Sequence, residues 1–254
     1  MDTNKALLLQ VFGESSEEEE EEVEGESGSN RCWERFDEIR GLWLCRDFLS
    51  PQHQSFLLSA VRNEGWFSEA SHNQAMRFGE LPSWAMALSD SIHDAVLSCS
   101  FNVPTEPMDF GSCNGRNELP CPFPSDLLWR EPLFDQLIAN LYNPGEGICA
   151  HVDLMRFEDG IAIVSLESSC VMHFSQVEAE GGESSCNSSS STGANTKKIP
   201  VYLNPGSLIL MSGEARYQWK HEINRKPGLQ LWEGHELEQG TRTSITLRKL
   251  RCVE

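Results

Sequence analysis

Two histidines and an aspartate in the second half of the chain have the types and spacing of a metal site. His151 and Asp153 are separated by a single residue, and His221 follows much later. Two histidines and one carboxylate form a facial triad, which binds non-haem Fe(II) through three ligands and leaves open positions for a co-substrate and O₂. This set of residues therefore predicts oxygenase chemistry at iron.

Two arginines further along the chain suggest an anchor for a dicarboxylate. If residues 242–248 form a strand, Arg242 and Arg248 share one polar face, and the other face is largely apolar. Guanidinium groups suit carboxylates, and a five-carbon dicarboxylate fills the gap between two extended arginines. Asn140 and Tyr142 share a face on an earlier expected strand, and both can hydrogen-bond a carboxylate or keto oxygen. An outer strand with solvated arginines is the alternative interpretation.

The three candidate ligands need strands to bring them together. Residues two apart on a strand face the same side, so His151 and Asp153 would point together, after a tight hairpin turn at residues 143–147. His221 lies on an expected strand whose alternate positions are apolar or aromatic, where a histidine is more often a core residue than a ligand. Its combination with the other two ligands and the arginines favours a ligand. His173 is the alternative, expected to be a strand residue without a site role.

Short apolar runs separated by turn residues dominate the chain beyond residue 125. Many short strands at such spacing predict a β-sandwich or a jelly roll. The runs cover residues 137–142, 160–166, 170–174, 201–203, 207–211, 217–223 and 243–250.

The first half of the chain is expected to supply a strand and two helices. Residues 41–45 have the pattern of a strand, and Ser50 and Pro51 have that of an N-cap and first helical residue. A second stripe of apolar residues at helical spacing runs through residues 84–97. Residues 99–124, rich in Pro, Cys, Asn and Gly, are expected to form a long loop.

Acidic residues are concentrated at the N-terminus. The chain has a formal net charge of -19, and its first 30 residues hold ten acids against one lysine. Such a block repels itself and buries nothing, so residues 1–30 are expected to be a disordered acidic tail, or alternatively an interaction tail with an unknown partner. Residues 176–198, rich in Ser, Gly and Glu, are expected to be a disordered insert. Residues 31–124 would then extend a catalytic core at 125–254.

Composition also limits the kinds of binding partner and the cellular compartment that are expected. The rest of the chain is acidic as well and shows no strong basic footprint, which weakens but does not exclude a nucleic-acid substrate. Nine cysteines without a Cys-x-x-Cys pair, and no signal-like leader, predict reduced thiols in the cytoplasm and/or nucleus. No segment reaches about 18 apolar residues, so no membrane span is expected.

Four motifs in this order resemble the AlkB family of Fe(II)- and 2-oxoglutarate-dependent dioxygenases. The resemblance covers about residues 125–252, and residues 41–67 are similar to the family's entry strand and helix. The motifs are Asn140-Leu-Tyr142-x-Pro144-Gly145, His151-x-Asp153, Ser212-Gly213-x-x-Arg216-Tyr217-x-Trp219-x-His221 and Arg242-x-Ser244-x-Thr246-x-Arg248.

The resemblance implies an α+β, mainly β fold, with a double-stranded β-helix (jelly-roll) core and N-terminal helices packed against it. It implies Fe(II), 2-oxoglutarate and O₂. The substrate lid of nucleic-acid-acting relatives would lie around residues 66–80, which show no obvious basic cluster. Ser244 stands where some relatives have Asn and is given no firm contact. The implied iron ligands are His151, Asp153 and His221; Arg242 would bind the distal carboxylate of 2-oxoglutarate, and Asn140, Tyr142 and Arg248 would complete its pocket.

The implied reaction couples decarboxylation of 2-oxoglutarate, which gives succinate and CO₂, to hydroxylation of a substrate C–H bond. Where that carbon is an N-methyl group, the hydroxylated product collapses to formaldehyde and the free amine. Two substrate classes fit: a modified base of RNA, tRNA or DNA, and a protein side chain. The alternative from another class is a catalytically silent binding module that keeps the fold. Release of succinate in a coupled assay would distinguish an active enzyme from such a binding module.

The two low-complexity segments should be dispensable. We expect deletion of residues 1–30 together with 177–197 to leave activity intact, because neither segment has the apolar content to pack against a core. Succinate release and thermal unfolding of the doubly deleted protein measure this. A deleted protein that does not fold would show that these segments are structural and that the boundaries are wrong.

Overall fold

Two antiparallel sheets form the frame of the molecule in the computed structural model, which describes residues 33–69, 72–101, 121–177 and 197–251. The larger sheet consists of β1 (Trp33–Arg35), β2 (Leu42–Cys45), β3 (Gln74–Phe78), β4 (Gln136–Tyr142), β6 (Ile161–Leu166), β9 (Leu208–Met211) and β13 (Arg242–Arg248). The smaller sheet consists of β5 (Ile148–His151), β7 (Cys170–Gln176), β8 (Lys198–Leu203) and β10 (Trp219–Ile223). A separate hairpin joins β11 (Leu231–Trp232) to β12 (His235–Glu236).

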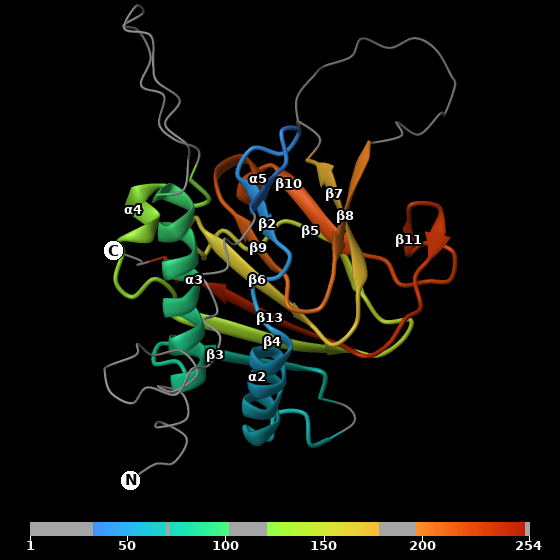
Figure 1. The fold of residues 1–254 in the computed structure, drawn as a ribbon, viewed down its shortest axis with the longest axis horizontal. Helices are drawn as coiled ribbons and strands as arrows, with labels where there is room; N and C mark the ends of the chain where they lie inside the picture. The colour runs from blue at the N-terminus through green and yellow to red at the C-terminus, as the bar shows by residue number, and fades with distance from the viewer. Residues whose placement is uncertain (1–32, 70–71, 102–120, 178–196, 252–254) are drawn as a thin grey trace, which may run out of the picture.

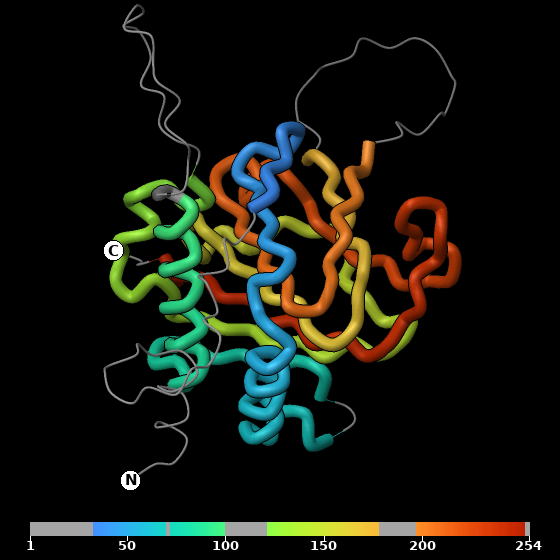
Figure 2. The backbone as a smooth tube through the Cα atoms, in the orientation of Figure 1, coloured from blue at the N-terminus to red at the C-terminus, as the bar shows by residue number. Residues whose placement is uncertain are grey.

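The order of the strands is that of a closed jelly roll. The larger sheet runs β1-β2-β9-β6-β13-β4-β3, and the smaller runs β5-β10-β7-β8. Strand β2, near the start of the described chain, pairs with β9 from its last quarter (Figure 2). The mainly β double-stranded β-helix with N-terminal helices is therefore confirmed. The division into an extension and a core at residue 124 stays a prediction, although β1, β2 and β3 belong to the same sheet as the core strands.

Helices cover the outer face of the larger sheet (Figure 1). They are α2 (Pro51–Asn63), α3 (Ser83–Phe101) and the short α4 (Ser125–Leu128). The short helix α5 (Gly213–Tyr217) instead leads into β10, and its Ala215 packs in the layer between the two sheets. As predicted, Ser50 caps α2 by accepting a hydrogen bond from the His53 N–H, and Pro51 is the first helical residue. Helix α3 runs to Phe101, so the expected loop at 99–124 is wrong at its first residues. Residues 102–120 lie outside the described residues.

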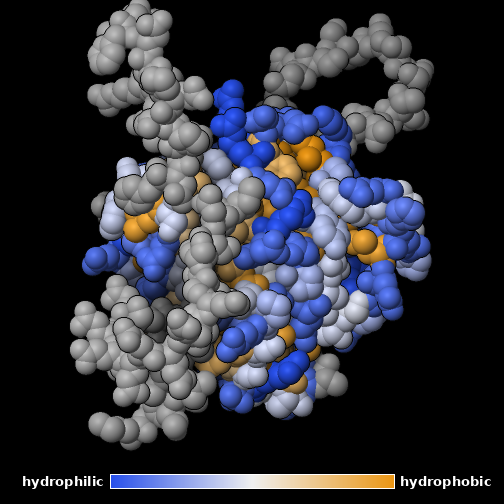
Figure 3. Space-filling model, in the orientation of Figure 1, coloured by the Kyte–Doolittle hydropathy of each residue, from blue (hydrophilic) through white to orange (hydrophobic). Residues whose placement is uncertain are grey.

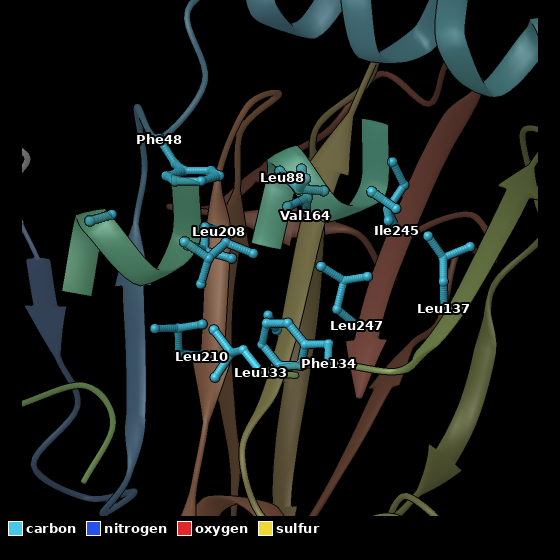
Figure 4. Packing of buried hydrophobic residues seen from close by; sticks show 14 of the residues in the cluster. Phe48, Leu88, Leu133, Phe134, Leu137, Val164, Leu208, Leu210, Ile245 and Leu247 are labelled. Carbon is cyan, nitrogen blue, oxygen red and sulfur yellow. The ribbon is translucent and has the colours of Figure 1, made fainter. Parts of the chain in front are cut away.

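The strand alternation divides the interior into two apolar layers. On β13, the odd positions Ile245 and Leu247 face the helices, where they pack with residues such as Leu88 and Phe48 (Figure 4). The second layer, which includes Phe174, lies between the two sheets. Each fully buried side chain of this size contributes about 1.5–3 kcal/mol, so the two layers fix the spacing of the sheets. The even positions of β13 point into the space between the sheets, where the polar residues gather.

The exterior of the molecule follows the same division. Figure 3 shows mainly hydrophilic residues on the viewed face of the described part, with small hydrophobic patches among them. Among the described helices, none has the length and apolar content needed to cross a membrane.

Most expected strands are present, and three further local expectations were wrong. Tyr217 ends α5 instead of starting a strand, and Asp153 lies in the loop after β5. Residues 143–147 carry the chain from one sheet to the other, because β4 pairs with β13 and β3 whereas β5 pairs with β10. The expected insert at about 176–198 stays a prediction, since most of it lies outside the described residues; β7 ends at Gln176 and β8 begins at Lys198.

Candidate functional site

A cavity of about 310 Å³ lies between the two sheets and is lined by every residue predicted to hold the metal or the co-substrate. We call it the site cavity. The neighbouring strands β4 and β13 of the larger sheet supply one wall, and β5 and β10 of the smaller sheet supply the opposite wall. The predicted residues that line it are Asn140, Tyr142, His151, Asp153, His221, Arg242 and Arg248.

Pairing of β5 with β10 brings the two histidines together. His221 is directly opposite His151 in the register, and their ring centroids are 4.3 Å apart. The Nε2 atom of His221 lies 3.7 Å from Oδ2 of Asp153. One ligand atom from each of the three residues lies within 4.8 Å of the others. Since metal–nitrogen and metal–oxygen bonds are about 2 Å long, one ion fits between them.

The surroundings of both histidines suit metal binding. Nδ1 of His151 lies 2.8 Å from the Cys149 carbonyl, so an N–H donated there leaves the Nε2 lone pair free for a ligand bond. Burial lowers the pKa of His221 to about 4, and the nearby charges of His151, Arg248 and Arg216 lower it further against the opposing effect of Asp153. The His221 imidazole is therefore neutral at pH 7.

The two oxygens of the Asp153 carboxylate have different surroundings. Oδ1 accepts from Nη2 of Arg248 at 2.9 Å. Oδ2 is buried and, within the described residues, accepts no hydrogen bond. A buried carboxylate oxygen without a donor is unfavourable unless a cation binds it. This oxygen and the two imidazoles therefore fit a divalent metal such as Fe(II).

Arg242 has the features of an anion anchor. Its side chain is 1% exposed, and its Nε donates to Oγ of Ser165 at 3.0 Å. Nη2 is buried and has no acceptor within the described residues. The guanidinium carbon lies 5.5 Å from the centre of the Tyr142 ring. A buried cation with a spare donor at the wall of a polar cavity suits a carboxylate, so the residues present fit 2-oxoglutarate.

The neighbours of Arg242 on β4 add donors to the same wall. In the register Arg242 is opposite Tyr142, and Ser244 is opposite Asn140. Oδ1 of Asn140 accepts from Nε2 of Gln74 at 2.7 Å, which turns the amide nitrogen of Asn140 toward other partners. Burial raises the pKa of Tyr142, so its phenol stays protonated and can donate. The co-substrate contacts of these residues stay predictions.

Arg248 forms an ion pair with Asp153, one of the predicted metal ligands, which the sequence had not suggested. Its ion pair with Asp153 uses Nη2, whereas its buried Nε has no acceptor within the described residues. The guanidinium carbon also lies 4.7 Å from the centre of the Phe157 ring. Arg248 therefore links the predicted metal ligand Asp153 to the strand that carries Arg242, the predicted co-substrate anchor.

Four residues that support the site were assigned no role from the sequence, although Arg216 belongs to one of the four motifs. Ser165 orients Arg242, and Gln74 orients Asn140. Arg216 and Arg225 are nearly fully buried and bind backbone carbonyls around the cavity. The one signal for Ser165 was a hydroxyl within the otherwise apolar run of β6.

His173, the alternative ligand, lies outside the site cavity. It is half-buried on β7, opposite Glu222 of β10. Burial lowers its pKa, with Lys198 acting in the same direction and Glu222 against it. His235 also lies outside the cavity and is exposed on β12.

Comparison with known proteins agrees with this geometry. Residues 41–248 match the family model of the 2OG-Fe(II) oxygenase superfamily. The chain is 29% identical over 231 residues to the alkylated DNA repair protein ALKBH8 homolog of Arabidopsis thaliana, which covers 84% of this chain and 59% of that protein. It is 29% identical over 232 residues to the tRNA (carboxymethyluridine(34)-5-O)-methyltransferase alkbh8 of Xenopus tropicalis, covering 83% of this chain and 32% of that protein.

The solved structure of OsALKBH1 has the same fold. It superimposes with a TM-score of 0.52 at 14% sequence identity, covering 82% of this chain and 96% of that one. Because this chain spans only 59% and 32% of the two relatives named above, the activities of the whole relatives do not transfer to it directly.

His221 gives the sharpest test of the metal site. We expect His221→Ala to abolish Fe(II) binding at micromolar metal, because two remaining ligands hold labile Fe(II) poorly. Anaerobic Fe(II) titration followed by circular dichroism would measure binding and folding. His173→Ala on the neighbouring strand is the matched control and should bind iron normally. Unchanged iron stoichiometry in the His221 variant would remove His221 from the site.

Proposed function

Because the chain belongs to the 2OG-Fe(II) oxygenase superfamily and is AlkB-like, we propose that it oxidises a carbon substituent of a modified base in RNA, with tRNA as the first candidate. The family uses Fe(II), 2-oxoglutarate and O₂, and the chain is an oxidoreductase. The observation that supports the substrate is the composition of the mouth of the site cavity. The proposed substrate agrees with the cytoplasmic or nuclear location that the cysteine pattern predicts.

The protein contributes positions and charges to the reaction. When bound, iron would supply the decarboxylation of 2-oxoglutarate to succinate and CO₂ coupled to substrate hydroxylation, with one atom of O₂ entering succinate and the other entering the hydroxylated substrate. His151, Asp153 and His221 would hold the ion on one side and leave the other side open. Hydroxylation of an N-methyl carbon would release formaldehyde and the free amine, whereas hydroxylation of a carbon-linked substituent would leave a stable alcohol.

The co-substrate would lie along β13. Arg242 would bind the distal carboxylate with its unused Nη2, while Ser165 keeps the guanidinium in place. Asn140 and Tyr142 would donate to the co-substrate from β4, the neighbouring strand. Such fixed donors keep 2-oxoglutarate in one orientation, and this is how the chain favours the productive geometry.

Apolar and basic side chains lie at the site cavity and beside it. Met76, Leu154 and Arg156 line the cavity. Phe78 lies beside them, with its ring centre 5.8 Å from the Arg156 guanidinium carbon, and Met155 lies between Leu154 and Arg156 in the chain. The four apolar side chains are 40% to 59% exposed. We call these five residues the cavity rim. Exposed side chains of this kind are costly in water and suit flat apolar ligands. An unstacked base fits the apolar members, and its phosphate fits the arginine.

The relatives support the same substrate class. One is named for alkylated DNA repair and another for tRNA carboxymethyluridine methylation, although the chain covers only part of each. The acidity of the whole chain argues in the opposite direction and favours a protein side chain as the second candidate. The cavity rim lies at the site itself, whereas the acidity is spread over the whole chain. The rim therefore favours a nucleic-acid base over a protein side chain as the substrate.

A substrate screen tests the proposal. Succinate release is measured with total tRNA, with methylated DNA oligonucleotides and with methylated peptides, and the bases are analysed by mass spectrometry for an added oxygen or a lost methyl group. We expect tRNA to stimulate turnover and to carry the product. Arg156→Gln should raise KM for tRNA and leave KM for 2-oxoglutarate unchanged, whereas exposed Arg35→Gln on β1 should change neither. Stimulation by peptides alone would overturn the proposal.

Arg242→Lys tests the co-substrate anchor. Lysine keeps the charge but loses the paired contacts to a carboxylate, at a cost on the order of 2 kcal/mol. This corresponds to a rise of roughly thirtyfold in KM for 2-oxoglutarate. Titration of 2-oxoglutarate in a succinate assay without a second substrate gives the value, and iron affinity should not change. Arg46→Lys, remote on the sheet, is the control. Normal KM and turnover in the Arg242 variant would contradict the anchor role.

A further inference from the structure

Two buried arginines flank the strand that carries His221. Arg216 lies in α5 just before β10, and Arg225 lies two residues after it; their exposed fractions are 1% and 2%. Burying a guanidinium charge is costly unless it is paired with an acid. Within the described residues, every hydrogen bond they donate ends on a backbone carbonyl. A carbonyl alone does not require a charge, so their placement calls for another reason.

Arg216 holds the loop that carries the metal carboxylate. Its Nη1 donates to the Asp153 carbonyl at 3.0 Å, and its Nη2 donates to the Leu154 carbonyl at 2.8 Å. Nη2 also donates to the Phe157 carbonyl at 3.2 Å. One planar group therefore fixes this loop at both ends. The loop has no strand partner at Asp153, because β5 ends at His151.

Arg225 holds the ends of the two strands that carry the co-substrate residues. Its Nη1 lies 3.2 Å from the Asn143 carbonyl and 3.5 Å from the Tyr142 carbonyl, where β4 ends. Its Nη2 donates to the Gly240 carbonyl at 2.6 Å, two residues before Arg242 begins β13. The same guanidinium therefore ties β4 to β13 at the end that bears Tyr142 and Arg242.

We propose that Arg216 and Arg225 are positioning residues that act on separate halves of the site. Arg216 sets the metal half by fixing Asp153, and Arg225 sets the co-substrate half by fixing Tyr142 and Arg242. Because both arginines lie next to β10 in the chain, each connects its half of the site to the strand that carries His221. Neither lines the site cavity, so each acts through the backbone. This inference rests on the proposed function, since it takes the metal and co-substrate assignments as given.

Arginine is required at both positions by the number of acceptors. A guanidinium presents several donors in a fixed plane and reaches three carbonyls at once, whereas a lysine ammonium at the end of a flexible chain cannot reproduce that arrangement. Losing the fork removes the hydrogen bonds that tie separate segments together. The Leu154, Asn143 and Gly240 carbonyls keep a second donor, but that donor does not reproduce the tie, so the loop or the strand ends shift. Displacement of a ligand by a fraction of an ångström weakens the site that the ligand belongs to.

The chain contains a matched control. Arg130 also donates to three backbone carbonyls, those of Leu133, Asp159 and Gly160. It lines a different cavity, beside α3 and α4, and no described contact ties it to the proposed ligands. Arg130→Lys therefore measures the loss of stability that follows when such a network is broken away from the site.

The experiment compares Arg216→Lys, Arg225→Lys and Arg130→Lys with wild type in the full chain. Mn(II) affinity is measured by electron paramagnetic resonance without co-substrate, and 2-oxoglutarate affinity is measured at saturating Mn(II). Urea unfolding gives the stability of each variant. If a lysine variant does not fold, the glutamine variant at the same position, which buries no charge, replaces it.

We expect a split between the two affinities. Arg216→Lys should weaken Mn(II) binding by about tenfold or more and change 2-oxoglutarate affinity by less than about threefold, and Arg225→Lys should do the reverse. Arg130→Lys should lower stability alone. Equal effects on both affinities, no effect, or the same pattern in the Arg130 variant would overturn the inference. Wild-type protein that binds neither ligand would instead overturn the proposed function.

Discussion

Buried positive charge around the site cavity is the constraint on which the rest of the structure depends. Arg242 and Arg248 line the cavity, Arg216 and Arg225 are buried behind it, and Asp153 is the one carboxylate among the described lining residues. Unpaired buried guanidinium groups are costly. Their charge must therefore be compensated by hydrogen bonds to backbone carbonyls, by the Asp153 carboxylate and by a bound anion. A dicarboxylate would relieve the repulsion that a metal cation meets here. The binding of 2-oxoglutarate and of Fe(II) should therefore favour each other.

The two sheets provide the rigid support that this charge requires. One end of the space between them is closed by apolar side chains, and the other end holds the polar cavity. Helices α2 and α3 cover the back of the larger sheet, so β4 and β13 are supported from outside while their inner faces carry the site. The N-terminal strands complete that sheet. The site therefore depends on parts of the chain that hold none of its ligands.

The substrate side combines two opposite electrostatic features. The chain as a whole is acidic, so long-range attraction of a nucleic acid is weak or absent. The cavity rim offers apolar surface and Arg156 at short range. Recognition of a base would therefore depend on stacking and shape at the rim more than on overall attraction. That preference favours a short unstacked stretch over a long duplex.

The sequence alone determined the chemistry, because residue type sets it. Two histidines, one aspartate and two arginines define a facial metal set and a carboxylate anchor before any coordinates exist. The alternation of β4 and β13 also placed Asn140 with Tyr142, and Arg242 with Arg248, on shared faces, because the period of a strand is local. Packing of the two sheets decided that these faces point into the cavity. Helix α2 was predictable from its N-cap for the same reason.

Only the tertiary structure decided how the parts meet. Asp153 was expected on a strand, but it lies in a loop whose geometry is set by Arg216, from a segment about sixty residues later. The turn at residues 143–147 has the composition of a hairpin, yet it joins two sheets, since strand partners are chosen by the whole core and not by the turn. The ion pair of Arg248 with Asp153 and the clamp formed by Arg225 join residues far apart in the chain. No local pattern encodes such pairs, because their energy exists only once the sheets have packed.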